Sequence, residues 1–241
     1  TALLHSAVVM EKRDSLKVWT ILLAILTFSL SLMGTFLVRS GVLSSVHAFA
    51  TDPMRGTFIL TLLAIYCGGA FTLYALRAPS LKTLRLFTPV SRESTLVANN
   101  LLLITMAATI LTGTLYPMIM DTLNLGQISV GAPYYNATVV IMALPLFILM
   151  GIGPFLPWKR PGRWTFKTTL GTCALITLAA TLFILGKPAL QVMGFATAIW
   201  LIVSSAAYLL QNRINLKSLS IALGHAGIGI AVIGIIGTAM W

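Results

Sequence analysis

Long runs of apolar residues separated by short polar segments dominate the chain. A helix that crosses the roughly 30 Å hydrocarbon core of a membrane needs about 20 such residues. Runs of this length predict spans over residues 17–38, 57–76, 94–117, 135–156, 168–186, 191–210 and 219–241. We expect the apolar residues 1–10 to be the end of a helix that begins further upstream. The pattern therefore predicts an all-α polytopic membrane bundle in one domain, residues 1–241, with seven full spans and one truncated N-terminal helix.

Composition agrees with this class. Hydrophobic residues make up 58% of the 241 positions and charged residues only 9%, with a mean hydropathy of +0.95. Because a soluble domain carries about 25% charged residues, the composition excludes a water-soluble globular protein. Cys67 and Cys173 lie far apart inside apolar runs, so we predict neither a structural disulfide nor a zinc site.

The basic residues alternate from loop to loop. Sixteen Lys and Arg against five acids give a formal net charge of +11. Thirteen of the sixteen fall in alternate inner loops: Lys12, Arg13, Lys17, Arg77, Lys82, Arg85, Arg92, Lys159, Arg160, Arg163, Lys167, Arg213 and Lys217. Since cytoplasmic loops are enriched in Lys and Arg, these loops are predicted to face the cytoplasm. The charge is thus a signal of topology in lipid, and we expect no nucleic-acid partner.

The first outer loop has a more particular sequence. Between Arg39 and Arg55, apolar residues recur at helical spacing, which predicts an interfacial helix on the outer side of the membrane over about residues 40–51. His47 lies on its polar face. Asp52 followed by Pro53 predicts the N-cap and first position of the next span.

Two further histidines lie inside spans at similar depth. His5 precedes Glu11 by six residues, about 9 Å along a helix, and His225 follows Lys217 by eight, about 12 Å. An ionisable residue at such a depth is costly and suggests a function. Neutral imidazoles are axial ligands for haem iron, so His5 and His225 are candidates for a bis-His haem. Proton transfer and ordinary packing stay open as alternatives.

The surroundings of His225 are rich in glycine. Gly224, Gly227 and Gly229 flank it, and Gly229 lies one turn along the same face, which we expect to leave space for a macrocycle. Close helix packing is the alternative explanation for these glycines. We predict no catalytic residue: the five acids lie outside the spans, and the chain has no P-loop, G-x-S-x-G or H-E-x-x-H motif.

Several motifs carry a family resemblance. They are the segments 3–7 (LLHSA), 34–43 (GTFLVRSGVL), 45–50 (SVHAFA), 113–117 (GTLYP), 128–133 (ISVGAP) and 151–154 (GIGP). Together they resemble the CcmF-type cytochrome c haem lyase over nearly the whole chain. The resemblance implies a bacterial inner-membrane protein of system I cytochrome c maturation. It would take haem from a CcmE-type periplasmic chaperone and, with a CcmH-type thiol protein, join it to the Cys-x-x-Cys-His motif of apocytochrome c.

The resemblance also assigns residues. It implies a permanent b-type haem between His5 and His225, which would reduce the iron of the transferred haem. It implies a second haem in transit, with His47 as an axial ligand. Arg39 and Arg55, the basic residues of that outer loop, are then candidates to pair with its propionates.

The sequence departs from the family pattern at both ends. The family's tryptophan-rich haem-handling segment and first periplasmic histidine are expected upstream of Thr1, and its large periplasmic domain is expected after Trp241. The chain is therefore expected to be a central part of the lyase. A small-molecule or haem transporter is the alternative function, although we find no internal repeat of the kind that transporters show.

The alternating charge gives a testable topology. Reporter fusions at Arg85 and Arg160 should give a cytoplasmic signal, and fusions at Ser44 and Ile128 a periplasmic one, because basic loops stay in the cytoplasm. A periplasmic signal at Arg85 would contradict the predicted orientation.

Overall fold

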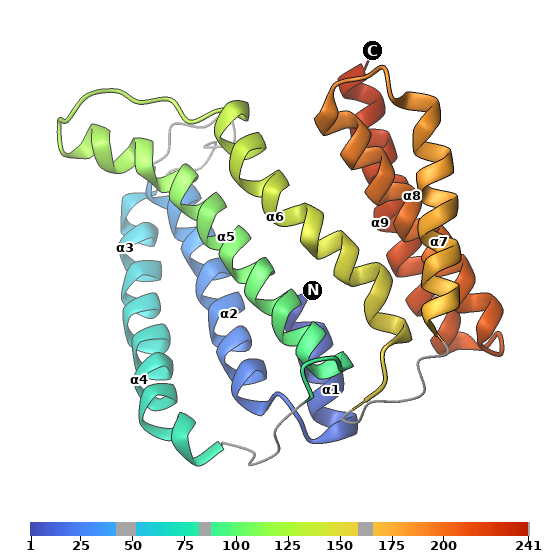
Figure 1. The fold of residues 1–241 in the computed structure, drawn as a ribbon. Coiled ribbons are helices and arrows are strands. Elements are labelled where there is room, and N and C mark those ends of the chain that lie inside the picture. The colour runs from blue at the N-terminus through green and yellow to red at the C-terminus, as the bar shows by residue number, and fades with distance from the viewer. Residues whose placement is uncertain (42–51, 82–87, 159–165, 241) are drawn as a thin grey trace. The chain divides into compact units, whose positions relative to one another are not determined.

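The protein is all helical in the part that the structure describes. The computed structural model describes residues 1–41, 52–81, 88–158 and 166–240, and Figure 1 shows its helices as α1 to α9. In these residues, seven helical segments are long and apolar enough to cross a membrane. Each of the seven predicted spans corresponds to one of them. The predicted fold class, a polytopic helical membrane protein, is therefore confirmed.

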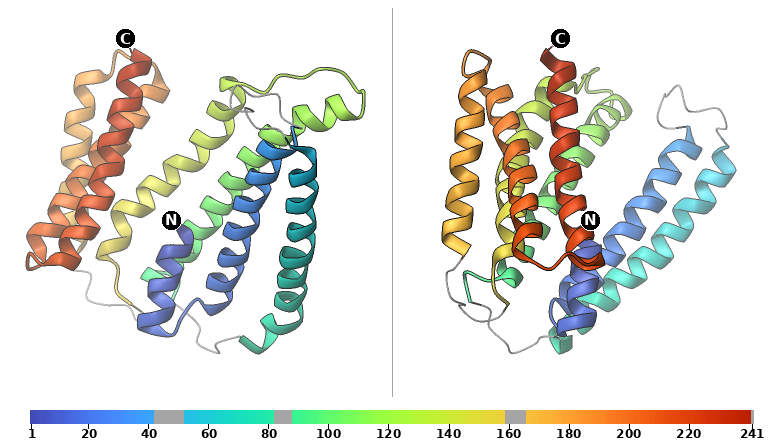
Figure 2. Two further views of the ribbon diagram at one scale, coloured as in Figure 1. Left: turned by 180° about the vertical axis from the view of Figure 1, so that it is seen from behind. Right: turned by 90° about the vertical axis from the view of Figure 1, so that its right-hand side faces the viewer.

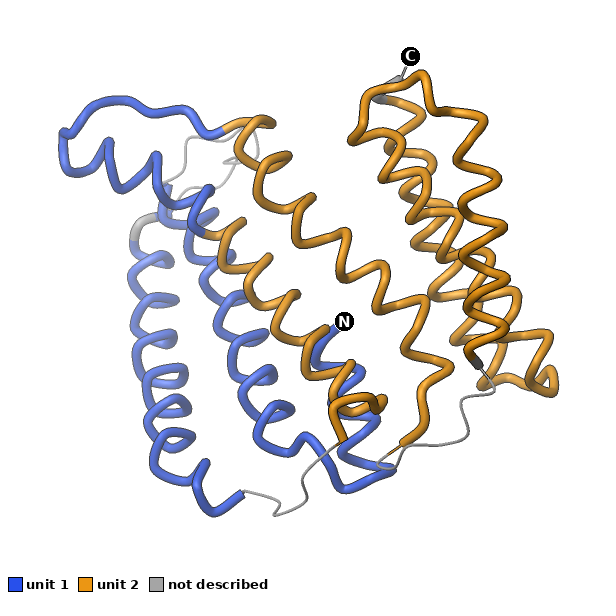
Figure 3. Tube along the Cα trace, viewed as in Figure 1, with its two compact units in different colours: residues 1–86, 112–130 blue, residues 87–111, 131–241 orange. Residues whose placement is uncertain are grey.

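The chain divides into two compact units (Figure 3). Residues 1–86 and 112–130 form the first unit, and residues 87–111 and 131–241 form the second. Helix α5 (Arg92–Thr122) contributes its first part to the second unit and its last part to the first. Compact units of one membrane bundle need not be separate domains, so the single domain predicted from the sequence stays a prediction.

The first unit is organised around α2. Its helical elements are α1 (Ala2–Arg13), α2 (Lys17–Ser40), α3 (Pro53–Leu62), the π-helical turn η1 (Leu63–Cys67), α4 (Gly68–Arg77) and the 3₁₀ turn η2 (Ala78–Leu81). Helix α2 contacts α1 on one side and the α3 to α4 segment on the other. The Tyr74 hydroxyl of α4 donates to the Val18 carbonyl of α2 at 3.4 Å. Helix α2 thus joins α1 to the α3 to α4 segment.

The ends of α2 and α3 meet closely. The Asp52 side chain accepts hydrogen bonds from the backbone N–H groups of Met54 and Arg55, with Pro53 in the first turn, which confirms the predicted N-cap. The Asp52 N–H in turn donates to the Arg39 carbonyl at 2.9 Å. Of the predicted interfacial helix over 40–51, Ser40 is the last residue of α2. Residues 42–51, and His47 with them, lie outside the described residues.

The second unit is organised around α8. It contains the first part of α5, then α6 (Ala132–Ile152), η3 (Gly153–Phe155), α7 (Phe166–Thr181), η4 (Leu182–Ile184), α8 (Ala189–Gln211) and α9 (Leu216–Met240). Helix α8 contacts α6, α7 and α9, and Figure 2 shows α7, α8 and α9 running beside one another. Ala198 and Leu201 of α8 are fully buried. The core of this unit therefore lies along α8.

Helix α5 extends beyond the predicted third span. The apolar run predicts a span over about residues 94–117, and α5 continues through Pro117 to Thr122. Proline removes only its own N–H from the helical ladder, and membrane helices tolerate this loss because other groups satisfy the freed carbonyl. The chain leaves the helix later, and Gly126 has a φ of 109° in the turn before α6.

Candidate functional site

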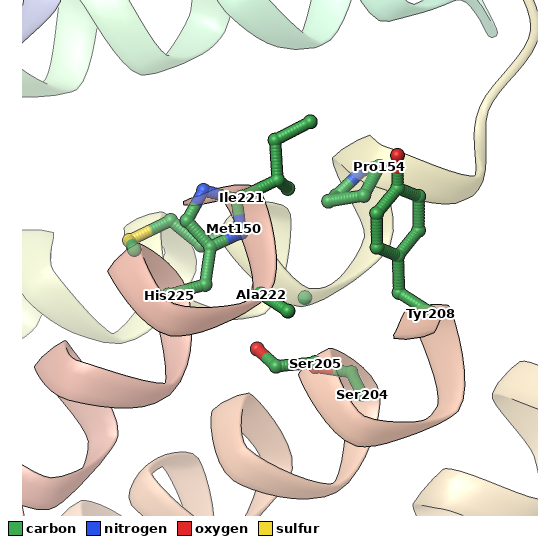
Figure 4. A pocket seen from close by; sticks show the side chains of 9 residues that line it. Met150, Pro154, Ser204, Ser205, Tyr208, Ile221, Ala222 and His225 are labelled. Carbon is green, nitrogen blue, oxygen red and sulfur yellow. The ribbon is translucent and has the colours of Figure 1, made fainter. Parts of the chain in front are cut away.

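His225 lies at a recess between three helices of the second unit (Figure 4). The residues that line it come from α6, η3, α8 and α9: Met150, Gly151, Pro154, Ser204, Ser205, Tyr208, Ile221, Ala222 and His225. His225 is half-buried there, whereas Ala222, Ser204 and Ser205 are buried. The recess therefore presents an imidazole beside mostly apolar groups.

Helices α8 and α9 are in close contact at Gly229. A Cβ atom added to Gly229 would lie 2.8 Å from the Ala198 carbonyl oxygen and 2.9 Å from the Ile202 Cγ1. The space that we predicted at Gly229 for a macrocycle is therefore filled by α8, and that prediction is wrong. Gly224 and Gly227 differ, because an added Cβ would meet no atom within 4 Å. Periodicity placed Gly229 near His225 but could not tell which neighbour covers it.

A second close contact joins α6 to α8 at the recess. A Cβ added to Gly151 would overlap the Nε1 atom of Trp200 and lie 3.0 Å from the Ser204 Oγ. The Trp200 indole N–H donates to the Ile148 carbonyl at 3.3 Å. The absence of a side chain at Gly151 thus lets the indole lie against the α6 backbone. Gly151 belongs to the 151–154 motif noted in the sequence, but its contact with Trp200 could not be predicted from that motif.

His5 lies on α1 in the first unit and is exposed. Its Nδ1 atom lies 3.1 Å from the carbonyl oxygen of Thr1. A carbonyl can only accept, so Nδ1 carries the hydrogen and Nε2 of a neutral ring keeps its lone pair. Metal-bound histidines commonly hold their other ring N–H in this way, which fixes the tautomer.

Arg39 and Arg55 lie on either side of the chain segment that contains His47. The half-buried Arg39 comes at the end of α2, and its carbonyl accepts from Asp52. Arg55 is in the first turn of α3, and its Nε forms an ion pair with Asp52 Oδ2 at 3.1 Å. The Asp52 backbone bond thus brings the two arginine positions to one end of the first unit. What lies around His47 itself is outside the described residues.

Arg92, at the first position of α5, was predicted only as one basic residue among the inner loops. Its Nε donates to the Leu156 carbonyl at 2.7 Å, its Nη2 donates to the Pro154 carbonyl, and its backbone N–H donates to the Pro157 carbonyl. The guanidinium carbon also lies 5.3 Å from the centre of the Trp158 ring. The signal that could have indicated this role is the pair of prolines after α6.

Comparison with known proteins gives a consistent set of relatives. The chain is 48% identical over 256 residues to the cytochrome c-type biogenesis protein CycK of Rhizobium meliloti (strain 1021), covering 98% of this chain and 38% of that protein. It is 40% identical over 245 residues to the cytochrome c-type biogenesis protein CcmF of Escherichia coli (strain K12), again covering 98% and 38%. The chain spans about two fifths of the length of the curated relatives it matches. A search against family models finds no match.

The fold also has a counterpart among solved structures. The chain is similar to the structure titled cytochrome c heme lyase CcmF, with a TM-score of 0.71 and 22% sequence identity. The likeness covers all of this chain and 37% of that one. At this identity it supports the helical fold and not the details of a site.

The close approach at Gly229 predicts a selective effect of a single methyl group. Gly229→Ala should lower the free energy of unfolding by about 1–3 kcal/mol, because the added carbon meets the α8 backbone and Ile202. Gly227→Ala, two residues away and open, is the matched control and should leave stability unchanged or slightly raised. Thermal unfolding in detergent measures both. Equal stability of the two variants would contradict the packing.

Proposed function

Because the chain belongs to the CcmF-type family of cytochrome c-type biogenesis proteins, we propose that it acts as the membrane core of a cytochrome c haem lyase. The observation that carries this proposal is 40–48% identity to CcmF and CycK proteins over nearly the whole chain. The whole protein would join haem to the Cys-x-x-Cys-His motif of apocytochrome c, as part of a complex. Its partners would be a CcmE-type haem chaperone, a CcmH-type thiol protein and the apocytochrome.

The protein is a polytopic membrane protein, and we propose the bacterial inner membrane as its location. The distribution of basic residues supports an orientation with the loops around Arg13, Arg77, Arg92, Lys167 and Arg213 in the cytoplasm. Residues 42–51 would then lie on the periplasmic side. This is the side on which apocytochrome c and the haem chaperone would be met.

His5 and His225 are the proposed axial ligands of a permanent b-type haem. The described residues fit such a group: Nδ1 of His5 lies against a carbonyl and leaves Nε2 to bind, and His225 is half-buried at a recess of largely apolar side chains. Apolar walls limit the access of water to a bound metal group. A Cβ added to Gly224, next to His225, would meet no atom of the second unit within 4 Å. Gly229 has no part in this proposal, since α8 covers it.

The chain's own residues would bind and orient the haem and shield it from water. The covalent bonds would form between the two substrates, haem and apocytochrome c. Each thioether forms by addition of a cysteine S–H across a haem vinyl double bond, so this step neither gains nor loses electrons. When bound, the permanent haem supplies a one-electron couple that can keep the iron of the substrate haem ferrous. His5 and His225 would set that couple through their neutral imidazoles.

The haem in transit is proposed to bind at the periplasmic end of the first unit. His47 would be one axial ligand, and Arg39 and Arg55 would pair with the propionates. The hydrogen bond from Asp52 to the Arg39 carbonyl supports this grouping, because it holds the two arginine positions near one another. Bidentate contacts between guanidinium and carboxylate groups are strong and directional.

Replacing either ligand of the permanent haem should change its spectrum. The reduced full-length protein should show a six-coordinate, low-spin b-type spectrum, and His5→Ala or His225→Ala should lose it or make the haem labile, since one axial bond is missing. Absorption spectroscopy of purified protein measures this. The double variant should be little worse than either single one, because the two ligands act as a unit. A fully retained low-spin spectrum in His225→Ala would count against the ligation.

Replacing His47 should affect the haem in transit and not the permanent haem. His47→Ala in the full-length protein should abolish cytochrome c maturation and leave the b-type spectrum intact, because the two ligand sites are proposed to lie on opposite sides of a core about 30 Å thick. Covalent haem staining of a reporter cytochrome c and the absorption spectrum give the two readouts. Excess imidazole should partly restore maturation if the role is ligation. Normal maturation, or joint loss of both haems, would contradict two separate sites.

A further inference from the structure

The end of α6 has carbonyl groups that its own chain leaves without helical donors. Pro154 and Pro157 carry no N–H, so neither continues the helical ladder. A residue that precedes proline is also disfavoured from helical conformation, and Leu156 is extended with a ψ of 146°. The helical path therefore stops after η3, and the last carbonyls need donors from elsewhere in the protein.

Arg92 supplies these donors. Its Nε and Nη2 atoms reach the carbonyls of Leu156 and Pro154, and its backbone N–H reaches that of Pro157 at 3.0 Å. The positive charge also lies at the C-terminal end of α6, where the helix dipole favours a cation. One residue at the start of α5 therefore holds the whole turn from 154 to 157.

This turn forms one edge of the His225 recess. Pro154 lines the recess together with Tyr208 and His225 (Figure 4). Phe155, the next residue, packs its ring edge to face with Tyr208 at 5.8 Å between centroids. A shift of the turn would therefore move both Pro154 and the Tyr208 ring relative to His225.

The chemistry of the contact is specific to arginine. A guanidinium is a planar fork that donates to two carbonyls at once, whereas the lysine ammonium is a point charge on a flexible stem. The Trp158 ring, 5.3 Å from the guanidinium carbon, adds a cation–π contact. Lysine at this position would keep the positive charge but could not donate to both carbonyls in the same planar geometry.

We propose that Arg92 is a positioning residue for the haem ligand His225. By fixing the 154 to 157 turn, Arg92 sets the shape of the recess and thus the orientation in which His225 meets the iron. This inference rests on the proposed function, in which His225 binds haem. Arg92 acts through Pro154 and Tyr208 and touches neither haem nor substrate.

The test compares Arg92→Lys and Arg92→Gln with Arg213→Lys in the full-length protein. Arg213 is an exposed residue in a predicted inner loop, so its variant is the matched control. Both Arg92 variants should lose haem to apomyoglobin about tenfold faster than wild type, the low end of the effect of changing an outer partner of a metal ligand. Their low-spin signals in electron paramagnetic resonance should broaden or shift, and the Arg213 variant should match wild type.

The outcomes separate this inference from the proposed function. If wild type carries no b-type haem, the proposed function fails first. If wild type carries it and Arg92→Lys retains both the spectrum and the rate of haem loss, Arg92 has no positioning role and the inference is wrong.

A second pair of variants covers the case in which Arg92 variants do not accumulate. Tyr208→Leu removes the ring that Phe155 contacts, and Tyr208→Phe keeps it. The Leu variant should shift the low-spin signals in the same direction as an Arg92 change, while the Phe variant should not. Unchanged signals in Tyr208→Leu would overturn the proposed path from the turn to His225.

Discussion

In lipid, every backbone polar group needs a hydrogen-bond partner within the protein. This constraint shapes both units. Water is absent from the hydrocarbon core, so a carbonyl that loses its helical N–H must find another donor. Prolines create this need inside α5 at Pro117 and inside α6 at Pro145, and again at Pro154. At the end of α6, the Arg92 side chain donates to the carbonyls of Leu156 and Pro154, and the Trp200 indole adds a donor to the Ile148 carbonyl of α6. The same donors hold the end of α6, which lines the recess beside His225.

The same environment explains why small residues decide where helices touch. Lipid tails are as apolar as leucine, so helices associate through close packing and through hydrogen bonds rather than through expulsion of water. Gly151 leaves room for the Trp200 indole, and Gly229 leaves room for the α8 backbone around Ala198. In the first unit, a Cβ on Gly56 would lie 2.9 Å from the Ser40 Cα. The large side chains that remain exposed, such as Phe28 and Phe183, are those expected to face lipid.

The sequence predicted the elements well and their contacts poorly, for a physical reason. Hydrophobic length follows from the thickness of the membrane, so the seven spans and the Asp52 cap could be predicted from local patterns. Which face of a helix meets a neighbour depends on packing, so Gly229 was assigned to a haem and proved to lie against α8. Arg92 was missed because the charge pattern treats all loop arginines alike. The prolines that make its role necessary lie about 60 residues further along the chain.

The ion pair between Arg55 and Asp52 bears on the propionate proposal. The pair is exposed, with 70% of the Arg55 side chain and 40% of the Asp52 side chain accessible. Exposed pairs contribute about 0–1 kcal/mol, so Asp52 holds Arg55 only weakly against a competing carboxylate. Asp52 keeps its capping bonds to Met54 and Arg55 backbone N–H groups whether or not this pair persists. A guanidinium has five N–H donors, of which the contact with Asp52 uses one. Asp52 therefore holds the backbone at this end of the unit in place while leaving Arg55 able to bind a second anionic group, as a propionate contact requires.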